Sequence, residues 1–357
     1  MKHTTANQPL VHGGDLISAS KASGIPLENW LDLSTGISPY AYPINSLPAD
    51  AFTKLPYIDR SFIKSVKTYY GSDDFVALPG TQTAIHLLPN LLSKLPVLLP
   101  DIGYQEHAQA WHKSGNTLDY YSAMDKKTAH KEIELKLNQN SGQHLVIINP
   151  NNPSTLCFTP QQLILWATKL ENDAYLIIDE AFIDSSPQMS LIPYLSNNVT
   201  NNIIVLRSFG KFFGLAGIRL GFMFASEDKL GLVEAHLPLW SVNGPALHLA
   251  TLALNDAQWQ TDHQNKLVES EQLTRTLFEA LAYHSCAHQR LFSSYTFPKK
   301  LALIIFECFY LEGILLRLIE LSEDLSIIRI GRIKVEDQTA QHRIRSVLDK
   351  LARTIHL

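Results

Sequence analysis

Leu206-Arg-Ser-Phe-Gly-Lys-Phe-Phe-Gly-Leu-Ala-Gly-Ile-Arg-Leu-Gly-Phe222 is the most informative segment of this chain. Its single lysine, Lys211, follows a short apolar run and lies among glycines and apolar residues. Because desolvation disfavours a charged ammonium, an amine in such surroundings is a good nucleophile toward an aldehyde. Ser208 and Arg219 lie three residues before and eight residues after the lysine. A hydroxyl and a guanidinium together bind phosphate well. The alternative to such a binding site is an ordinary loop with a surface lysine and an arginine in a salt bridge.

Short apolar runs alternate with helical patterns in the middle of the chain. The runs cover residues 97–99, 145–148, 175–178 and 203–206, and each ends at a polar or turn residue, as buried parallel strands do. Between the second and third runs, Thr159 and Pro160 begin a helix with one apolar stripe. This order predicts a mainly parallel sheet with helices on both faces. Ligands then bind beyond the carboxyl ends of the strands.

Polar residues follow several of these predicted strands. Asp179 ends the third run, where a carboxylate can hold a protonated ring nitrogen or cap the next turn. Residues 149–153 read Asn-Pro-Asn-Asn-Pro. A tight turn explains this composition, and so does an amide of Asn149, Asn151 or Asn152 that donates to a ring oxygen.

A glycine and small polar residues open another predicted helix. Gly80, Thr81 and Gln82 begin it, and the free backbone N–H groups at a helix start bind anions, although ordinary capping has the same composition. Tyr104 follows a further run and can stack on an aromatic ring. Taken together, these groups match the aldehyde, ring nitrogen, ring oxygen and phosphate of one molecule, which is pyridoxal 5'-phosphate.

Two of these segments resemble the signatures of a known family. Ser208-Phe-Gly-Lys211 with Arg219 resembles the lysine signature of fold-type-I pyridoxal-phosphate-dependent transferases, and residues 179–182 resemble their aspartate strand. The resemblance implies an α/β fold: a large domain with a mainly parallel seven-stranded sheet flanked by helices, and a small α+β domain. It implies that Lys211 binds the cofactor covalently and that Asp179 holds the ring nitrogen. The implied cofactor contacts are Gly80, Thr81, Gln82, Tyr104, Asn152, Asp179, Ser208, Lys211 and Arg219.

Within this fold, the chain is similar to the threonine-phosphate decarboxylases of cobalamin biosynthesis, which are close to histidinol-phosphate aminotransferases. The similarity lies in residues 12–14, 31–39, 239–243, 313–317 and 328–331. It implies decarboxylation of L-threonine O-3-phosphate to (R)-1-amino-2-propanol O-2-phosphate. Transamination of a phosphorylated substrate such as histidinol phosphate is the alternative. The implied substrate contacts are His12, Ser38, Arg317, Arg329 and Arg332.

The chain departs from the family pattern at three places. Phe182 stands where a tyrosine is common, so one hydroxyl to the ring oxygen is absent. Tyr57 lies in Leu-Pro-Tyr rather than Tyr-Pro-Asp, which leaves a contact from a partner subunit to the cofactor phosphate open. Arg329 and Arg332 are closely spaced, so which of them binds carboxylate and which binds phosphate is also open.

The end of the chain has a different character. A long polar helix is predicted from Trp259 to about residue 284, followed by a shorter α+β region. We expect residues 1–50 to form an N-terminal arm and part of a small domain. Residues 51–255 form the large cofactor-binding domain, and residues 256–357 form the C-terminal small domain. From the fold family we also expect a homodimer.

Composition limits the possible partners. With 30 basic and 34 acidic residues the formal net charge is -4, so we expect no nucleic-acid partner. Apolar runs such as residues 301–306 are far shorter than the roughly 18 residues that span a bilayer. The start of the chain has no apolar signal-peptide core, and three distant cysteines suggest no disulfide framework. We expect a cytoplasmic enzyme that acts on a small phosphorylated amino acid.

One segment has the alternation of a metal site. His284-Ser-Cys-Ala-His288 places potential ligands at every second residue, but no second pair completes a four-ligand set. We interpret the segment as a helix end or loop and expect no metal.

Overall fold

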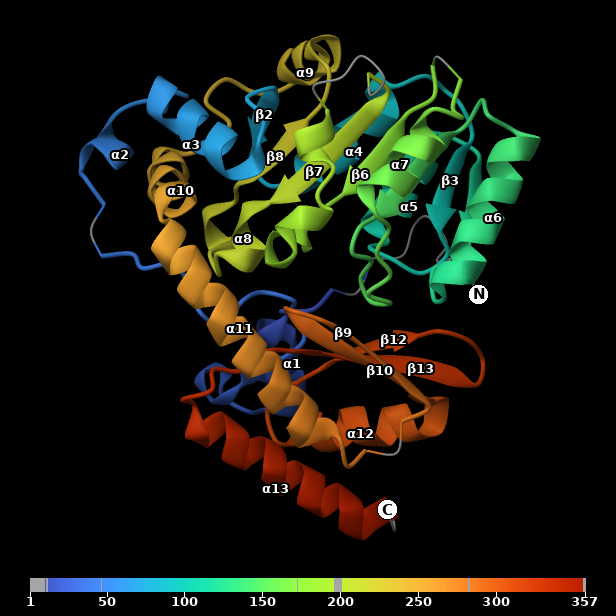
Figure 1. The fold of residues 1–357 in the computed structure, drawn as a ribbon. Coiled ribbons are helices and arrows are strands. Elements are labelled where there is room, and N and C mark those ends of the chain that lie inside the picture. Colours follow the sequence, from blue (N-terminus) through green and yellow to red (C-terminus); the bar gives the residue numbers. More distant parts are fainter. Residues whose placement is uncertain are drawn as a thin grey trace. The chain divides into compact units, whose positions relative to one another are not determined.

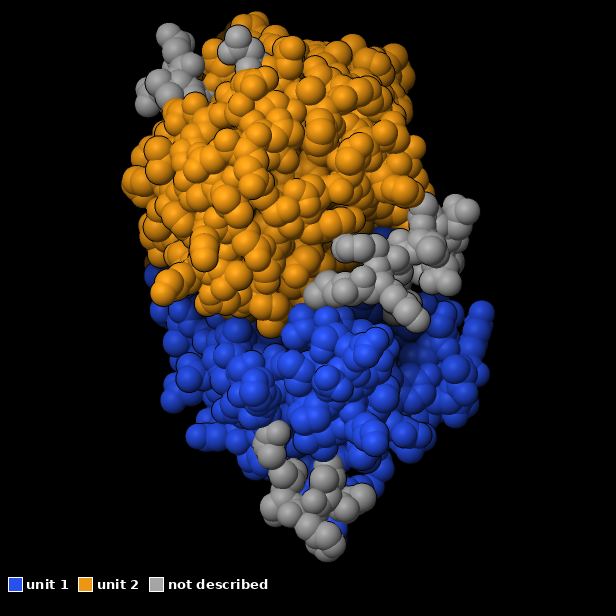
Figure 2. All heavy atoms as spheres, turned by 90° about the vertical axis from the view of Figure 1, so that its right-hand side faces the viewer, with its two compact units in different colours: residues 1–40, 261–357 blue, residues 41–260 orange. Residues whose placement is uncertain are grey.

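The structure, a computed structural model, describes residues 10, 12–45, 47–171, 173–195, 201–281 and 283–355. The chain divides into two compact units: residues 41–260 form the large unit, and residues 1–40 with 261–357 form the small unit (Figure 2). The division falls at residues 40 and 260, close to the expected boundaries at residues 50 and 255. Helix α11 (Ala257–Phe278) continues through the second division.

The large unit is built on a seven-stranded sheet with the order β2-β8-β7-β6-β5-β3-β4 (Figure 1). Strand β8 pairs antiparallel with both β2 and β7, and the other neighbouring strands pair in parallel. The four apolar runs predicted to be strands are confirmed as parts of β3, β5, β6 and β7. The strand bounds are β2 Phe75–Leu78, β3 Val97–Pro100, β4 Leu118–Tyr121, β5 His144–Ile148, β6 Leu176–Asp179, β7 Ile203–Ser208 and β8 Gly221–Phe224.

Burial of both faces explains the apolar runs. All residues of β5 and β6, and the first five of β7, are buried, because helices cover both sides of the sheet. Helices α4, α5 and α9 pack on one face in a single apolar cluster. On the other face, Phe62 of α3 stacks on Phe222 of β8 at 6.1 Å between ring centroids. The helix bounds are α2 Asp50–Thr53, α3 Arg60–Tyr70, α4 Gln82–Leu91, α5 Glu106–Lys113, α6 Lys126–Gln139, α7 Pro160–Ala167, α8 Phe209–Phe212, α9 Glu227–Glu234 and α10 Gly244–Asn255.

Helix α7 begins as the sequence predicted. Thr159 is its N-cap, the side chain of Thr159 accepts a hydrogen bond from the backbone N–H of Gln162 at 3.3 Å, and Pro160 is the first helical residue. A proline at this position loses no helical hydrogen bond, because the first N–H groups of a helix have no partner within it.

Strand register brings several chain segments to one edge of the sheet. Gly221, the first residue of β8, pairs with both Leu78 and Ser208, the last residues of β2 and β7. Asp179, the last residue of β6, pairs with Leu206. The segments that follow β2, β6 and β7 and the segment that precedes β8 therefore meet at the carboxyl edge.

The small unit contains a four-stranded antiparallel sheet with the order β12-β13-β10-β9. Its apolar face, which includes Phe297 and Ile328, packs in one cluster with helices α11, α12 and α13. A short parallel pair joins β1 and β11. The bounds are α1 Leu16–Ser23, β1 Leu31–Asp32, β9 Ser285–Gln289, β10 Phe292–Pro298, α12 Lys299–Leu311, β11 Ile314–Leu315, β12 Arg317–Glu320, β13 Leu325–Gly331 and α13 Gln338–Ile355.

Two predictions about this region were wrong in detail. The polar helix ends at Phe278 rather than near residue 284. Four residues of the segment 284–288, which was interpreted as a helix end or loop, belong to strand β9 (Ser285–Gln289), because β9 pairs with β10 along its whole length. The part of the chain that the structure describes contains no group of three His, Cys, Asp or Glu side chains arranged to hold a metal. None of its helices has the length and hydropathy needed to cross a membrane.

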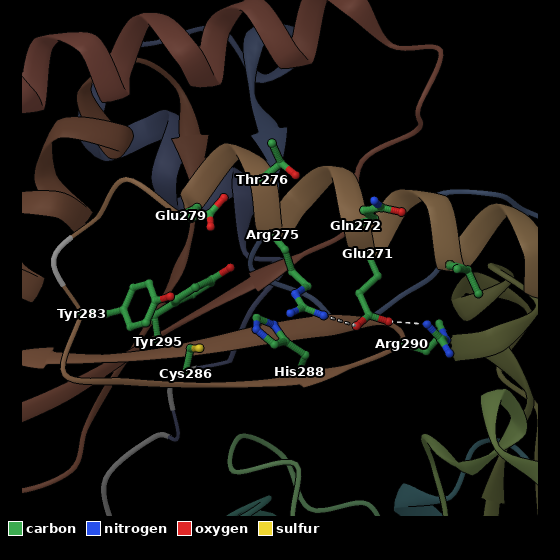
Figure 3. Close-up of a pocket in the computed structure, with 11 residues that line it drawn as sticks. Glu271, Gln272, Arg275, Thr276, Glu279, Tyr283, Cys286, His288, Arg290 and Tyr295 are labelled. Atoms are coloured by element: carbon green, nitrogen blue, oxygen red, sulfur yellow. Dashed lines mark hydrogen bonds and ion pairs between the residues drawn. The ribbon is translucent and has the colours of Figure 1, made fainter.

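A cavity of about 430 Å³ lies between α11 and the β9–β10 hairpin of the small unit (Figure 3). Glu271 of α11 lies 2.5 Å from Arg290 and 3.9 Å from Arg275, so it partly neutralises both guanidinium groups. Tyr295 lines the cavity and belongs to the helix-covered face of the sheet.

A buried ionic cluster lies next to the carboxyl edge of the large sheet. Arg207 is 2% exposed and forms ion pairs with Asp184 and with Glu180, the latter at 3.3 Å. Its guanidinium also lies 4.5 Å from the ring centroid of Tyr70. Leu191 and Ser190 donate hydrogen bonds to Glu180 at 2.8 and 2.6 Å. Removing the cation would leave two buried carboxylates facing each other.

We therefore expect Arg207→Met to lower the free energy of unfolding by about 3–5 kcal/mol, because breaking a buried pair leaves uncompensated charge. Urea denaturation of the purified variants measures this. The matched control is Lys54→Met, which removes an exposed ion pair with Asp50 whose side chains are 70% and 66% exposed. Its loss should cost less than about 1 kcal/mol. Equal losses for the two variants would contradict the assignment.

Candidate active site

Lys211 lies in α8, immediately beyond the end of β7. Its Nζ is 3.4 Å from Oγ of Ser208 and 5.1 Å from the ring centroid of Phe182. The segment around the lysine is closely packed: a Cβ at Gly210 would lie 2.6 Å from Cα of Ala216. This glycine lets the chain after α8 fold back onto the lysine, as the glycine-rich sequence suggested.

Asp179 is buried at the same edge, with 3% of its surface exposed. Its Oδ2 lies 3.1 Å from Nε2 of His107, and its Oδ1 accepts the backbone N–H of Ala181 at 3.0 Å. Burial alone would raise the pKa of Asp179, but the hydrogen bond from His107 and its positive charge outweigh burial. The charge of Lys211 and the N–H of Ala181 act in the same direction, and the pKa of Asp179 lies below its ordinary value. The carboxylate is thus available to a cationic ring nitrogen.

Sequence reasoning did not identify His107. This residue is 2% exposed and belongs to the first turn of α5, the helix that follows β3. Its one sequence signal is its place three residues after Tyr104, at the start of that helix. A histidine there is no more suggestive than the other 13 histidines of the chain until the fold brings it to Asp179.

Gly80, Thr81 and Arg219 meet beside the start of β8. A Cβ at Gly80 would lie 2.6 Å from Nη2 of Arg219, and Gly80 has a φ of +85°. A Cβ at Gly221 would lie 2.6 Å from the backbone N of Thr81. Arg219 is exposed and donates a 3.2 Å hydrogen bond to the carbonyl of Ala216. Two glycines therefore leave room for a guanidinium and a helix-start N–H to converge, as a bound phosphate requires.

The asparagine turn is held by two of its three amides. Asn149 exchanges hydrogen bonds with the backbone of Phe158 at 2.7 and 3.1 Å. Asn151 donates to the carbonyl of Ile102 at 2.9 Å and to Ser154 at 2.8 Å. These contacts show how Asn149 and Asn151 hold the turn, and the contact of Asn152 with a ring oxygen stays a prediction.

Tyr104 lies near both the aspartate and the phosphate-binding residues. Its hydroxyl donates to Oε1 of Gln82 at 3.0 Å, and its ring packs edge-on against His107 at 6.3 Å between centroids. Burial raises the pKa of Tyr104 to about 12, with repulsion from Glu106 and Asp179 adding to it and Arg219 opposing it. The ring is half-buried, as a ring that covers one face of a ligand would be.

Two predicted substrate residues face each other in the small unit. Arg317 of β12 pairs directly with Arg329 of β13, so the two side chains emerge on the same face of the sheet. Arg329 donates to the carbonyl of Ser34. Burial lowers the pKa of Arg329 to about 10, with Arg317 adding to the effect and Asp32 opposing it. Like charges opposite each other destabilise a sheet unless an anion is shared between them.

Arg332 has different surroundings. Its guanidinium donates to the carbonyls of Gln289, Arg290 and Phe292 at 2.7, 3.0 and 2.9 Å. A fourth hydrogen bond, at 2.9 Å, reaches Oγ of Ser293. All three nitrogens are thus used to hold the β9–β10 turn. This set favours a structural role over the substrate contact predicted from the sequence.

The remaining predicted substrate residues lie in the first 40 residues. Ser38 is buried, and its hydroxyl bonds the backbone N and O of Tyr40 at 3.1 and 3.2 Å. His12 is exposed and precedes Gly13, where a Cβ would lie 2.2 Å from the carbonyl O of Ser34. The glycine therefore brings the His12 segment against the loop that also contacts Arg329.

The residues of the large unit fit pyridoxal 5'-phosphate. Glycines open a cradle beside Arg219 and Thr81, Asp179 is kept ionised, and Lys211 adjoins Ser208. These are the donors that a phosphate, a pyridinium nitrogen and an aldehyde need.

We expect His107→Leu to destabilise the apoprotein most at neutral pH, by about 1–3 kcal/mol, because Asp179 then keeps the cost of burial without its hydrogen bond. In the wild type, the lowered pKa of Asp179 contributes stability that is present above the unfolded pKa and lost as pH falls through the folded pKa. In the variant, we expect burial to raise the pKa of Asp179. Acidification then protonates the buried carboxylate and removes the cost of burying its charge. Urea midpoints from pH 7 down to pH 4 measure the difference, which should shrink on acidification. His112→Leu, at an exposed position of the same helix, is the control; a pH-independent difference would refute the coupling.

A second prediction concerns the glycine cradle. Gly80→Ala should weaken binding of pyridoxal 5'-phosphate at least about tenfold, since the new methyl group displaces the Arg219 guanidinium and strains a positive φ. Titration of apoprotein with the cofactor, followed by absorbance, measures this. Gly217→Ala is the matched control, because a Cβ there meets nothing within 4 Å. Wild-type affinity in the Gly80 variant would contradict a role of Gly80 and Arg219 in binding the cofactor phosphate.

Comparison with known proteins agrees with this site. The aminotransferase class I and II family matches residues 46–302. A threonine-phosphate decarboxylase of Pseudomonas aeruginosa is 37% identical over 297 residues, which cover 82% of this chain and 86% of that protein.

Solved structures share the fold. A histidinol-phosphate aminotransferase of Sinorhizobium meliloti in complex with pyridoxal-5'-phosphate aligns with a TM-score of 0.78 at 17% identity, covering 99% of this chain and 98% of the other. An L-threonine-O-3-phosphate decarboxylase of Porphyromonas gingivalis aligns with a TM-score of 0.70 at 15% identity, covering 90% and 99%. The chain therefore belongs to the aminotransferase class I and II family and is a pyridoxal-phosphate-dependent enzyme of fold type I.

Proposed function

We propose that this enzyme decarboxylates L-threonine O-3-phosphate to (R)-1-amino-2-propanol O-2-phosphate for cobalamin biosynthesis. The observation that carries the proposal is the 37% identity, over most of both chains, to the threonine-phosphate decarboxylase of Pseudomonas aeruginosa. The site residues are consistent with it. The cytoplasmic location expected from the sequence stays a prediction.

The large unit supplies the groups that handle the cofactor. When bound, pyridoxal 5'-phosphate accepts the electron pair that a bond to the substrate Cα leaves behind. Asp179, kept ionised by His107, holds the proton on the ring nitrogen. Lys211 binds the aldehyde before substrate arrives and afterwards delivers a proton from Nζ to Cα. Ser208, Arg219 and the Thr81 N–H hold the phosphate.

Orientation of the substrate selects the reaction. When bound, the cofactor would activate whichever bond to the substrate Cα the protein aligns with the ring's electron system. Alignment of the bond from Cα to the carboxyl carbon would release carbon dioxide, whereas alignment of the bond from Cα to its proton would lead to transamination. The groups that bind the substrate's anions therefore select the reaction.

We assign Arg317 and Arg329 to those anions. Their direct pairing across β12 and β13 places two cations on one face of the small sheet, which suits a substrate with both a carboxylate and a phosphate. Arg332 uses four N–H groups on Ser293 and the carbonyls around the β9–β10 turn, and its contact with substrate stays a prediction. His12 and Ser38 remain predicted substrate contacts.

Incubation of the holoenzyme with L-threonine O-3-phosphate tests the function. We expect carbon dioxide release without 2-oxoglutarate, and aminopropanol phosphate as the product. A strict requirement for an oxo-acid acceptor would show a histidinol-phosphate-type aminotransferase instead.

Borohydride reduction followed by peptide mapping should place the pyridoxyl group on Lys211, and Lys211→Ala should lose at least about a thousandfold in kcat. Arg317→Met should raise KM about tenfold or more, whereas the exposed Arg353→Met should not.

We also propose that the enzyme is a homodimer. Several large apolar side chains of the large unit are at least half exposed, and five of them lie close together in the sequence in two groups: Phe52, Leu55 and Tyr57, and Leu239 and Trp240. They belong to two neighbouring segments, since a Cβ at Gly244, the first residue of α10, would lie 2.2 Å from the carbonyl O of Ala51 in α2. An apolar patch of this kind marks an interface, and a two-fold pair of identical subunits buries it twice.

Trp240→Glu combined with Leu239→Glu should convert the dimer into monomers at micromolar concentration, because the interface would then bury two unpaired charges per subunit. Light scattering coupled to size-exclusion chromatography measures the mass. Leu165→Glu is the control, since Leu165 is 50% exposed on α7, away from these segments in the sequence. A wild-type protein that elutes as a monomer would exclude the homodimer.

A further inference from the structure

The side chain of Gln82 makes contacts that its predicted role in phosphate binding does not use. Its Oε1 accepts the hydroxyl of Tyr104 at 3.0 Å. Its Nε2 donates to Oε2 of Glu106 at 2.8 Å and lies 2.9 Å from Nε2 of His86, which accepts when unprotonated. The amide oxygen and both amide hydrogens therefore have partners.

The contacts link two parts of the active site. Gln82 is the first residue of α4 and follows the Gly80-Thr81 turn of the phosphate cradle. Glu106 is the first residue of α5, and the next residue, His107, bonds Asp179. The hydrogen bonds of Gln82 to Glu106 and Tyr104 thus join the start of α4, beside the predicted phosphate site, to the segment at the start of α5 that carries His107.

Charge fixes the direction of these hydrogen bonds. Glu106 presents a carboxylate, which accepts hydrogen bonds and repels an amide oxygen, so the Nε2 of Gln82 must face Glu106 and the Oε1 must face Tyr104. A hydroxyl whose pKa is raised to about 12 keeps its proton at neutral pH and donates to that oxygen. The directions of the Tyr104–Gln82 and Gln82–Glu106 hydrogen bonds are thus fixed, whereas Nε2 of His86, which lies 2.9 Å from Gln82 and 3.4 Å from Glu106, accepts or donates according to its tautomer.

We propose that Gln82, Glu106 and His86 are positioning residues that hold the ring of Tyr104 in place over the cofactor. The inference rests on the proposed contact between Tyr104 and the cofactor ring. A change of the χ1 rotamer of Tyr104 would carry its hydroxyl away from Gln82, so the anchored hydroxyl holds the side chain in one χ1 rotamer and fixes where the ring lies. A fixed ring orders the cofactor without touching the reacting atoms.

A purely structural tie between α4 and α5 is the competing explanation. The two helices already pack through buried apolar residues, including Ala84, Leu88 and Trp111, in the main cluster of the large unit. The side chain of His86 is 56% exposed, so the contacts of His86 add little to this packing. If these contacts only tie α4 to α5, their removal should lower the stability of the protein. If they position Tyr104, their removal should alter the environment of the bound cofactor.

A double-mutant cycle in the holoenzyme separates the two explanations. Tyr104→Phe keeps the ring and removes the anchored hydroxyl, and Glu106→Ala removes the group that directs the amide. We expect each to weaken cofactor binding about fivefold to tenfold and to reduce the visible circular dichroism band of the bound cofactor. The double variant should be no worse than either single variant, because both remove the same constraint. Glu106→Gln should retain most of the band, since its amide oxygen can still accept from Gln82.

Asn90→Ala is the control. Asn90 is exposed one turn after His86 on α4 and donates only to the backbone of that residue at 3.4 Å, so affinity and dichroism should stay at wild-type values. Additive losses in the double variant, or a wild-type dichroism band in Glu106→Ala, would overturn the proposal. Cofactor affinity and dichroism are measured without threonine phosphate. They therefore test the positioning of Tyr104 even if the decarboxylase assay fails. If the Tyr104→Ala variant keeps wild-type affinity and dichroism, the proposed contact between Tyr104 and the cofactor ring is itself wrong.

Discussion

The pairing of β8 against both β2 and β7 is the constraint on which the active site depends. The one antiparallel strand of the sheet starts at the edge where the parallel strands end, so Gly221 lies between Leu78 and Ser208. The segment before β8 then carries Arg219 to the turn after β2, while the lysine follows β7. Gly80 and Gly221 make this approach sterically possible, because a side chain at either position would occupy the space of the Arg219 guanidinium or the Thr81 backbone.

Neighbouring residues in the sequence have separate tasks at this edge. Asp179 faces His107, whereas the next residue, Glu180, joins the buried cluster around Arg207. Likewise Ser208 adjoins Lys211, whereas the preceding Arg207 holds Asp184 and Glu180. A strand presents successive side chains to opposite sides. The chemistry on one side is therefore supported by an ionic cluster contributed by the same strands on the other.

The arginines of the small unit also differ in their surroundings. Arg317 and Arg329 lie opposite each other on the sheet face that the helices do not cover, while Arg332 donates to the β9–β10 turn. Arginine is suited to both tasks, because its guanidinium is a permanent cation with five donors. Arg329 donates to the carbonyl of Ser34, whereas Arg332 donates to the carbonyls around the β9–β10 turn, so the surrounding acceptors differ between the two.

Much of the fold and the centre of the site could be read from the sequence, because they depend on local patterns. Buried strands require continuous apolar runs, a helix start requires a cap, and parallel strands direct the residues that follow them to one edge. These patterns predicted the four central strands and drew attention to Asp179 and Lys211, which follow two of them. Non-local contacts left no such pattern. The partner of Asp179, the side-chain contacts of Gln82 and the hydrogen bonds of Arg332 depend on which segments meet in space. A histidine or an arginine carries the same side chain wherever it lies, and its function follows from the acceptors and charges that distant parts of the chain place around it.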